Sequence, residues 1–355
     1  MPSCSAVRPS GTRPGAPRAD SPAADRPTER DHDVLAAGPG YHPRIVPTPI
    51  LLDCDPGHDD AVAILLALAS PELDLLGITT VGGNAPLERV TDNALRVLAL
   101  AGRPDVPVAA GAAHPLRGPL RTAPHVHGES GLEGPALPDR IAEPIDEDAI
   151  AFLARTIGDA VEPVTVIPTG PLTNIARLLD NHPDLKPRIA RFCLMGGAIG
   201  EGNITPSAEF NIWVDPEAAD IVFRSGVPIT MIGLDVTHRS IVWEEEYRAL
   251  AAEGGTAARL VAGLLEYFQA FHERIYGWRG TPIHDAVAVA HVAHPGLVTT
   301  RPYAVAIELD GALTRGRTVV DVRGVTGLPP NADVGVDIDR DRFVTLLRAA
   351  IRTFD

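Results

Sequence analysis

Four aspartates, Asp53, Asp55, Asp59 and Asp60, lie within eight residues in the segment DCDPGHDDAVAI. This segment begins where an apolar run that predicts a strand ends, and an apolar run that predicts a helix follows. Carboxylates so close together repel one another unless a cation neutralises them, and their hard oxygens favour Ca²⁺ or Mg²⁺. One or two of these acids could instead stabilise a helix N-terminus, but that role does not account for four. The pattern therefore favours a metal site.

A second acid-bearing segment, TPIHDAVAVAHVAH, lies far along the chain. His284 and Asp285 begin its apolar stretch, which predicts another helix. Asp285 could be an ordinary acid of a helix N-terminus, or it could complete the metal site from the far end of the chain, and spacing alone leaves both open. His125 and His127 form an HxH pair that could suggest zinc, but no third ligand stands at metal spacing.

These motifs lie in a chain whose pattern alternates between strands and helices. From about residue 45 to 236, short and nearly continuous apolar runs alternate with helical stretches. This rhythm predicts a single α/β domain with an open, doubly wound, mostly parallel sheet, helices on both faces and the active site at its C-terminal edge. Residues 111–143 and 238–279 break the rhythm, and such insertions usually build a binding site. The last segments predict a hairpin-like strand pair and a closing helix.

Composition narrows the class of protein. Hydrophobic residues make up 45% of the 355, enough for a large core, and the net charge of −15 argues against nucleic acids and anionic membranes as partners. No apolar run reaches the length of a membrane span. Three cysteines give no disulfide framework, which favours a cytoplasmic location. Residues 1–43 are rich in Pro, Ala, Gly, Arg and Asp, and are predicted to be a disordered tail before a domain spanning 44–355.

The segment DCDPGHDDAVAI resembles the N-terminal signature of the inosine-uridine nucleoside hydrolase family. Further similar segments follow in the family's order: TTVGGN, HGESGL, PTGPLTNIA, MGGA, GNITPSAEFNIWVDPEAA and PIHDAVAV. Together they span about residues 51–289, most of the chain after the tail. The resemblance implies an enzyme that hydrolyses the N-glycosidic bond of ribonucleosides to ribose and free base. It also implies Ca²⁺ as cofactor, a nucleoside as small-molecule partner, and a homodimer or homotetramer.

The resemblance also implies roles for individual residues. Ca²⁺ would be held by the carboxylates of Asp55, Asp60 and Asp285 and by the backbone carbonyl of Thr169. Asp55 would take the proton from a Ca²⁺-bound water, and His284 would assist departure of the base. Taken singly, most of these residues have an ordinary explanation as a turn, cap or core residue, so the ordered set carries the inference. The substrate would be bound by Asp59, Asn84, His127, Met195, Asn203, Glu209 and Asn211.

Two other classes of protein compete with this interpretation. A DxD pair after a strand also marks haloacid-dehalogenase-like phosphatases, but there a small residue and then Thr or Val would follow. Here Pro56, Gly57 and His58 follow instead. A non-catalytic nucleoside- or ribose-binding protein on the same scaffold is the stronger alternative. The presence of Asp55 and His284 favours catalysis, and an assay for base release separates the two.

The sequence indicates the preferred base less clearly than it indicates the reaction. The aromatic stretch containing Tyr267, Phe268, Phe271, His272 and Tyr276 is predicted to line or cover the base pocket, by analogy with a mobile helix of the family. The same residues could equally form the apolar face of an amphipathic helix. In having a histidine at position 284, the chain resembles the inosine-uridine and pyrimidine-preferring branches of the family, rather than the purine-specific branch. The choice among inosine, uridine and cytidine stays open.

Overall fold

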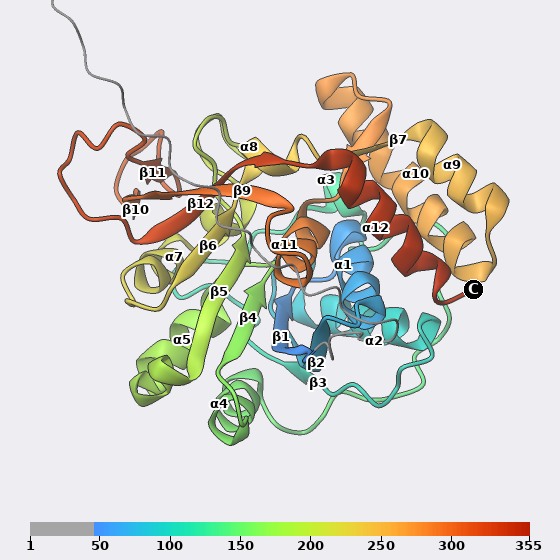
Figure 1. The fold of residues 1–355 in the computed structure, drawn as a ribbon, viewed down its shortest axis with the longest axis horizontal. Coiled ribbons are helices and arrows are strands. Elements are labelled where there is room, and N and C mark those ends of the chain that lie inside the picture. The colour runs from blue at the N-terminus through green and yellow to red at the C-terminus, as the bar shows by residue number, and fades with distance from the viewer. Residues whose placement is uncertain (1–45) are drawn as a thin grey trace, which may run out of the picture. The chain divides into compact units, whose positions relative to one another are not determined.

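A sheet of eight strands forms the centre of the molecule (Figure 1). The computed structural model describes residues 46–355, so the predicted tail of residues 1–43 lies outside the described residues. All neighbouring strands run parallel except the last two in the order, which are antiparallel. The mostly parallel sheet is thus confirmed. Its order is β3 (Val108–Ala110), β2 (Leu73–Thr80), β1 (Thr48–Cys54), β4 (Val164–Pro168), β5 (Ile189–Met195), β6 (Ile229–Ile232), β12 (Ala332–Ile338), β9 (Val298–Tyr303).

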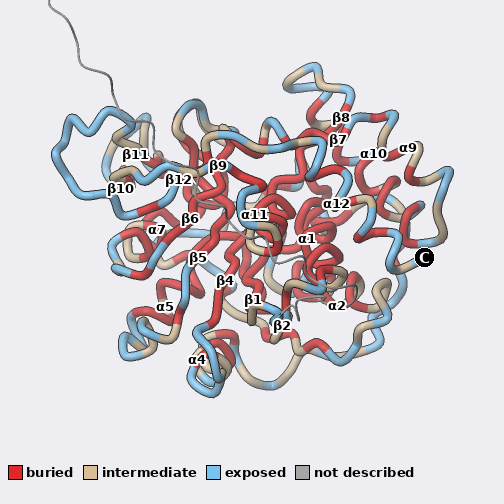
Figure 2. The backbone as a smooth tube through the Cα atoms, in the orientation of Figure 1, coloured by how far each residue is buried: buried red, intermediate tan, exposed pale blue. Residues whose placement is uncertain are grey.

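Helices cover both faces of this sheet, as predicted. Side chains alternate along a strand, so Ile50 and Leu52 of β1 enter one core cluster while Leu51 enters the other. Because both faces of β1 are buried, its apolar residues follow one another without alternation, and all residues from Ile50 to Cys54 are buried (Figure 2). The first cluster includes residues of α1 (His58–Ala69), α2 (Leu87–Leu100), α11 (His284–Ala293) and α12 (Arg340–Arg352). The second includes residues of α4 (Ala149–Asp159), α5 (Thr173–Asn181) and α7 (Pro216–Phe223).

The strand order reverses between β1 and β4. Helix α1 follows β1 on one face of the sheet, and α5 follows β4 on the other face. The two connecting loops therefore diverge and leave a crevice at the carboxyl ends of the strands, which is where open α/β sheets bind ligands. The loop after β1 contains residues 55–57, and the loop after β4 contains residues 169–172. Both loops carry residues of the sequence motifs.

The two predicted insertions lie beside each other. Residues 111–143 are irregular apart from one short helix, α3 (Pro124–His127). The second insertion contains β7 (Ile241–Trp243), α9 (Glu244–Glu253), α10 (Thr256–Tyr276) and β8 (Gly280–Pro282), and α10 contacts both α3 and α9. The remaining short helices are η1 (Pro183–Arg188), α6 (Phe210–Val214) and α8 (Leu234–Thr237).

The C-terminal part follows the prediction. Strands β10 (Val305–Ile307) and β11 (Thr318–Val320) form an antiparallel pair, and α12 closes the described chain. No helix within residues 46–355 has the length and apolar character needed to cross a membrane. Cys54 and Cys193 are both buried and form no disulfide bond. The cytoplasmic location stays a prediction.

Candidate active site

Three buried carboxylates meet at the carboxyl edge of the sheet. Asp59 and Asp60 lie in the first turn of α1, and Asp285 lies in the first turn of α11, which packs against α1. One carboxylate oxygen from each lies within 4.8 Å of the other two. Among residues 46–355 this is the only such group of three His, Cys, Asp or Glu side chains, and it contains neither His125 nor His127. The packing of two helices therefore brings the two acidic segments together.

The electrostatics of this cluster suit a cation. Burial first, and the charge of Asp60 second, raise the pKa of Asp59 to about 7. Burial raises the pKa of Asp60 to about 6, and burial with the charges of Asp59 and Asp60 raises the pKa of Asp285 well above its usual value. Carboxylates held this close in a dry site are stabilised when a divalent cation supplies positive charge. The three oxygens thus fit a metal ion.

Asp55 lies next to this cluster in a space that two glycines create. Its Oδ2 accepts a hydrogen bond of 2.6 Å from the backbone N–H of Asn84, and its buried Oδ1 has no hydrogen-bond partner among the described residues. A Cβ on Gly83 would lie 2.0 Å from Oδ2, and one on Gly170 would lie 2.7 Å from Oδ1. Burial, followed by the charge of Asp60, raises the pKa of Asp55 well above its usual value. Asp55 is therefore a second carboxylate site that would benefit from a nearby cation.

The fourth aspartate of the motif serves the fold. Asp53 Oδ1 accepts hydrogen bonds from Thr79 Oγ1 at 2.5 Å and from Asn174 Nδ2 at 2.7 Å. The same Asn174 amide donates to the carbonyl of Thr80, and its oxygen accepts from the N–H of Ala112. Asp53 thus ties β1 to β2 and α5, and Asn174 is more than the helix cap that its sequence context suggests.

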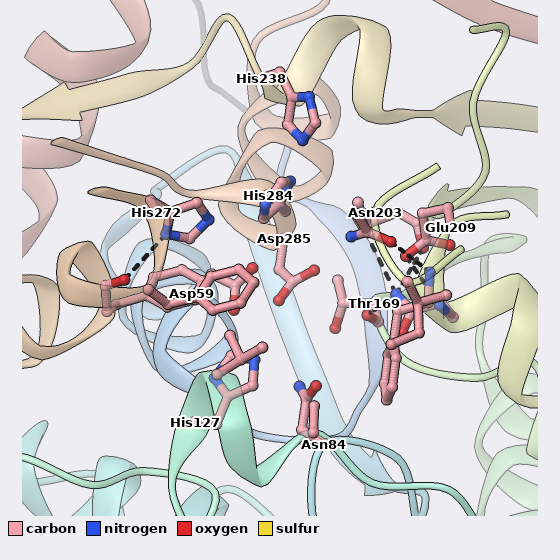
Figure 3. Close-up of a pocket in the computed structure, with 18 of the residues that line it drawn as sticks. Asp59, Asn84, His127, Thr169, Asn203, Glu209, His238, His272, His284 and Asp285 are labelled. Carbon is pink, nitrogen blue, oxygen red and sulfur yellow. Dashed lines mark hydrogen bonds between the residues drawn. The ribbon is translucent and has the colours of Figure 1, made fainter. Parts of the chain in front are cut away.

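A pocket opens in front of the carboxylates (Figure 3). Asp55 and Asp60 lie behind its surface, and every other predicted site residue lines it. We call the polar side of this pocket the carboxylate wall. It consists of Asp59, Asn84, Thr169, Asn203, Glu209, Asn211 and Asp285, with the fully buried Asp55 and Asp60 behind them.

Thr169 connects the carboxylates to the amides of this wall. Its hydroxyl donates to Asp60 Oδ1 over 2.7 Å, and its backbone carbonyl accepts from Asn211 Nδ2 over 2.7 Å. The carbonyl lies in the loop directly after β4. Asn203 accepts a bond of 2.9 Å from the N–H of Phe210, which fixes its orientation.

Glu209 caps α6 and is held almost entirely by backbone donors. Its Oε1 accepts from the N–H of Asn211 at 2.9 Å, and its Oε2 accepts from the N–H of Gly197 at 2.9 Å. Burial raises the pKa of Glu209 to about 7. The amide of Asn211 also donates to the carbonyl of Met195, at the end of β5, over 3.2 Å. These bonds fix the carboxylate wall to the ends of the strands.

Histidines and aromatic rings form the opposite side of the pocket, which we call the aromatic wall. It consists of His238, Phe268, Phe271, His272, Tyr276 and His284. Four of the five residues in the predicted aromatic stretch line the pocket. Tyr267 instead stacks on the ring of His58 at 5.2 Å between centroids, and it is 39% exposed.

His284 lies at the junction of the two walls. Its Nδ1 is 2.7 Å from the hydroxyl of Thr237, and the ring of His238 lies 5.6 Å from its own ring. Burial first, and then the neighbouring histidines, lower the pKa of His284 well below its usual value, so the ring is neutral near pH 7. A neutral ring still donates a hydrogen bond from its protonated nitrogen.

Sequence reasoning missed three residues around this site. His58, the first residue of α1, has its Nδ1 3.0 Å from Nδ1 of His127, and burial lowers the pKa of His58 to about 4. His238 was predicted only to begin the irregular stretch of residues 238–279, and Thr237 was not predicted to have a role. Their position could have been found, because they follow closely after β6 and therefore fall at the same sheet edge as the other motifs.

Comparison with known proteins agrees with this geometry. Residues 50–345 match the family described as inosine-uridine preferring nucleoside hydrolase. A pyrimidine-specific ribonucleoside hydrolase, RihA, of Escherichia coli O9:H4 (strain HS) is 50% identical over 307 residues, which cover 86% of this chain and 99% of that protein. The RihA of Escherichia fergusonii has the same identity and coverage. This chain belongs to the inosine-uridine preferring nucleoside hydrolase family.

Solved structures show the same fold. A purine-preferring ribonucleoside hydrolase from Gardnerella vaginalis superimposes with a TM-score of 0.81 at 35% identity, covering 86% of this chain and 99% of that one. A plant nucleoside hydrolase gives a TM-score of 0.80 at 34% identity with the same coverage. The protein is thus an enzyme that hydrolyses ribonucleosides, and the DxD phosphatase class is excluded.

Proposed function

We propose that this enzyme is a Ca²⁺-dependent hydrolase that prefers the pyrimidine ribonucleosides uridine and cytidine to inosine and adenosine. One observation carries the proposal: a carboxylate cluster and an aromatic wall face each other across a single pocket. The first suits a cation and a ribose, and the second suits a flat base. The base preference is supported by the pyrimidine-specific relative that shares half of its residues with this chain.

The metal would be held by the carboxylates of Asp55, Asp60 and Asp285 and by the carbonyl oxygen of Thr169. All four are hard oxygen donors, which Ca²⁺ prefers. The unpartnered Oδ1 of Asp55 and the crowded oxygens of Asp60 and Asp285 fit this assignment, while Asp59 lies close enough to share in it. When bound, Ca²⁺ supplies positive charge that lowers the pKa of a water and orients the ribose diol.

Asp55 acts as the general base. It accepts the proton of the attacking water on one of its two carboxylate oxygens. The bond to the N–H of Asn84 holds the carboxylate in place. As the glycosidic bond breaks, positive charge develops on the sugar, and the anionic oxygens of the carboxylate wall stabilise it.

His284 assists departure of the base. When the hydroxyl of Thr237 donates to Nδ1, the proton of the neutral ring resides on Nε2. A hydrogen bond from this nitrogen stabilises the negative charge that develops on the leaving base. His238, beside it, extends the same side of the pocket.

The decisive experiment compares release of base from uridine, cytidine, inosine and adenosine by the purified full chain. We expect the two pyrimidine nucleosides to have the highest kcat/KM. Removal of metal by a chelator should abolish activity, and Ca²⁺ should restore it better than Zn²⁺. Full activity in protein shown by elemental analysis to be metal-free would overturn the cofactor assignment. Faster hydrolysis of inosine than of uridine would overturn only the base preference.

We also propose that the enzyme is a homodimer or homotetramer. Large apolar side chains stand exposed in the loops before and after β11, among them Leu313 at 88%, Val325 at 82% and Leu328 at 62%. Exposed apolar side chains, where they gather into a patch, are typical of contact surfaces between subunits. Light scattering after size-exclusion chromatography gives the assembly directly, and a mass of one chain contradicts this proposal.

A further inference from the structure

His58 lies behind the wall of the pocket and has no part in the chemistry above. It is completely buried and is the first residue of α1. Its ring stacks against those of His127 at 5.2 Å and Phe268 at 5.3 Å, and Tyr267 covers it from outside. Both of its ring nitrogens have hydrogen-bond partners. A buried imidazole with two defined partners can fix where protons reside.

The proton positions follow from the partners. His58 Nε2 is 2.7 Å from the carbonyl oxygen of Glu133, which only accepts, so Nε2 must donate. In the neutral ring Nδ1 then carries a lone pair. This Nδ1 is 3.0 Å from Nδ1 of His127, so the nitrogen of His127 must supply the proton between them. The backbone N–H of His58 also approaches His127 Nδ1, but at 3.4 Å it is a weak contact and the shorter bonds decide.

The consequence lies at the pocket. With its proton on Nδ1, a neutral His127 has an unprotonated Nε2. No hydrogen bond to this nitrogen is formed within residues 46–355, and the nitrogen is not fully enclosed by protein. His127 itself lines the pocket. Nε2 is therefore the polar atom that His127 presents to a bound substrate. The residue lies beside Asn84, since a Cβ on Gly57 would touch both side chains (Figure 3).

We propose that His58 is a positioning residue that holds His127 in the tautomer whose Nε2 accepts a hydrogen bond from the substrate. The donor is a ribose hydroxyl or an N–H of the base. The role rests on the proposed function, because it presumes a nucleoside in this pocket. It gives two of the histidines that line the pocket opposite polarity: His127 accepts, whereas His284 donates to the base.

The tautomer of each histidine can be measured directly, without an assay of enzyme activity. In protein labelled with ¹⁵N at histidine, long-range ¹H–¹⁵N spectra distinguish a protonated ring nitrogen from an unprotonated one. We expect His127 to have an unprotonated Nε2, and His58 to have an unprotonated Nδ1. Spectra of the His58→Asn and His127→Gln variants assign the signals. A protonated Nε2 on His127 would overturn the proposal, whether or not the enzyme prefers pyrimidine nucleosides.

Two variants of His58 separate positioning from packing. His58→Phe keeps a ring between Tyr267 and Phe268 but offers no acceptor to His127, so His127 becomes free to protonate Nε2. We expect kcat/KM for uridine to fall about tenfold, the equivalent of one lost hydrogen bond. His58→Asn places an oxygen near the position of Nδ1, and we expect it to recover most of this loss. Equal losses in both variants, at equal melting temperatures, would leave His58 with a packing role only.

Substrate analogues identify the donor. The penalty of His58→Phe is measured on deoxyuridines that each lack one ribose hydroxyl and on 3-methyluridine, which lacks the N–H of its base. Removing the true donor removes the penalty, as in a double-mutant cycle. Loss of the penalty on one deoxyuridine assigns a hydroxyl, and loss on 3-methyluridine assigns the base. A penalty that persists on all of them would show that His127 accepts nothing from the substrate.

Discussion

The carboxylate wall and the aromatic wall face the same pocket but are built in different ways. The carboxylate wall consists of loops directly after strands and of the first turns of α1, α6 and α11, and backbone or side-chain hydrogen bonds hold its polar atoms. Most of the aromatic wall comes from α10, in an insertion outside the sheet, where edge-to-face and stacked contacts join the rings. Bond cleavage needs fixed geometry, and residues on insertions outside the sheet commonly carry binding specificity. We therefore expect the carboxylate wall to perform the chemistry and the aromatic wall to determine the base preference.

If the carboxylate wall performs the chemistry, its general base should be the most sensitive position. We expect Asp55→Asn to lower kcat by at least about a hundredfold, because an amide cannot accept the proton of the water. Initial rates on uridine with saturating Ca²⁺ measure the effect. Metal content and melting temperature must match the parent enzyme, and a near-native kcat under those conditions would contradict the assignment.

The rigidity of the same wall can be tested through its glycines. A Cβ at Gly83 would lie 2.0 Å from Asp55 Oδ2, so Gly83→Ala must displace this carboxylate. We expect a loss of about a hundredfold in kcat/KM, because displacing a catalytic group by about 1 Å has an effect of this size.

Gly158→Ala in α4 provides the matched control, because its nearest neighbour, Leu185 Cδ2, is 3.9 Å away. This helical substitution should leave kcat/KM unchanged and raise stability by about 0.5–1 kcal/mol. Equal activity of the two variants would show that the carboxylate tolerates movement.

His284 joins the two walls, and its effect should depend on the leaving group. We expect His284→Ala to lower kcat/KM for uridine by about tenfold to a hundredfold, the range of a hydrogen bond to a charged group. Hydrolysis of p-nitrophenyl riboside should change far less, because nitrophenolate leaves without help. Asp285 is adjacent, so calcium content is checked first. An equal fall on both substrates with calcium intact would indicate lost geometry instead.

The aromatic wall should respond mildly and selectively. Tyr276→Phe removes one hydroxyl from the pocket lining and keeps the ring, which stacks on Trp278 at 4.4 Å. We expect the ratio of kcat/KM for uridine to that for inosine to shift by less than about tenfold, with little change in p-nitrophenyl riboside hydrolysis. A comparable fall on all substrates would place Tyr276 in the chemistry and weaken the division between the walls.

Local patterns in the sequence predicted the fold class and indicated which residues gather at one edge of the sheet. Continuous apolar runs recurred between helical stretches because the central strands are buried on both faces. The residues after β1, β2, β4 and β5 could be predicted to meet, because the carboxyl ends of parallel strands share one edge. The role of the two insertions followed from their place beside this edge.

The tertiary structure decided what spacing could not. Asp285 could have been a plain helix acid until the packing of α11 on α1 placed it beside Asp59 and Asp60. Asp53 looked equivalent to its neighbours, yet its bonds to Thr79 and Asn174 assign it to the fold. Contacts of this kind join residues distant in the chain, and they depend on how helices and loops pack over the sheet. No local pattern encodes them, which is why the contact between the rings of His58 and His127 appears only in three dimensions.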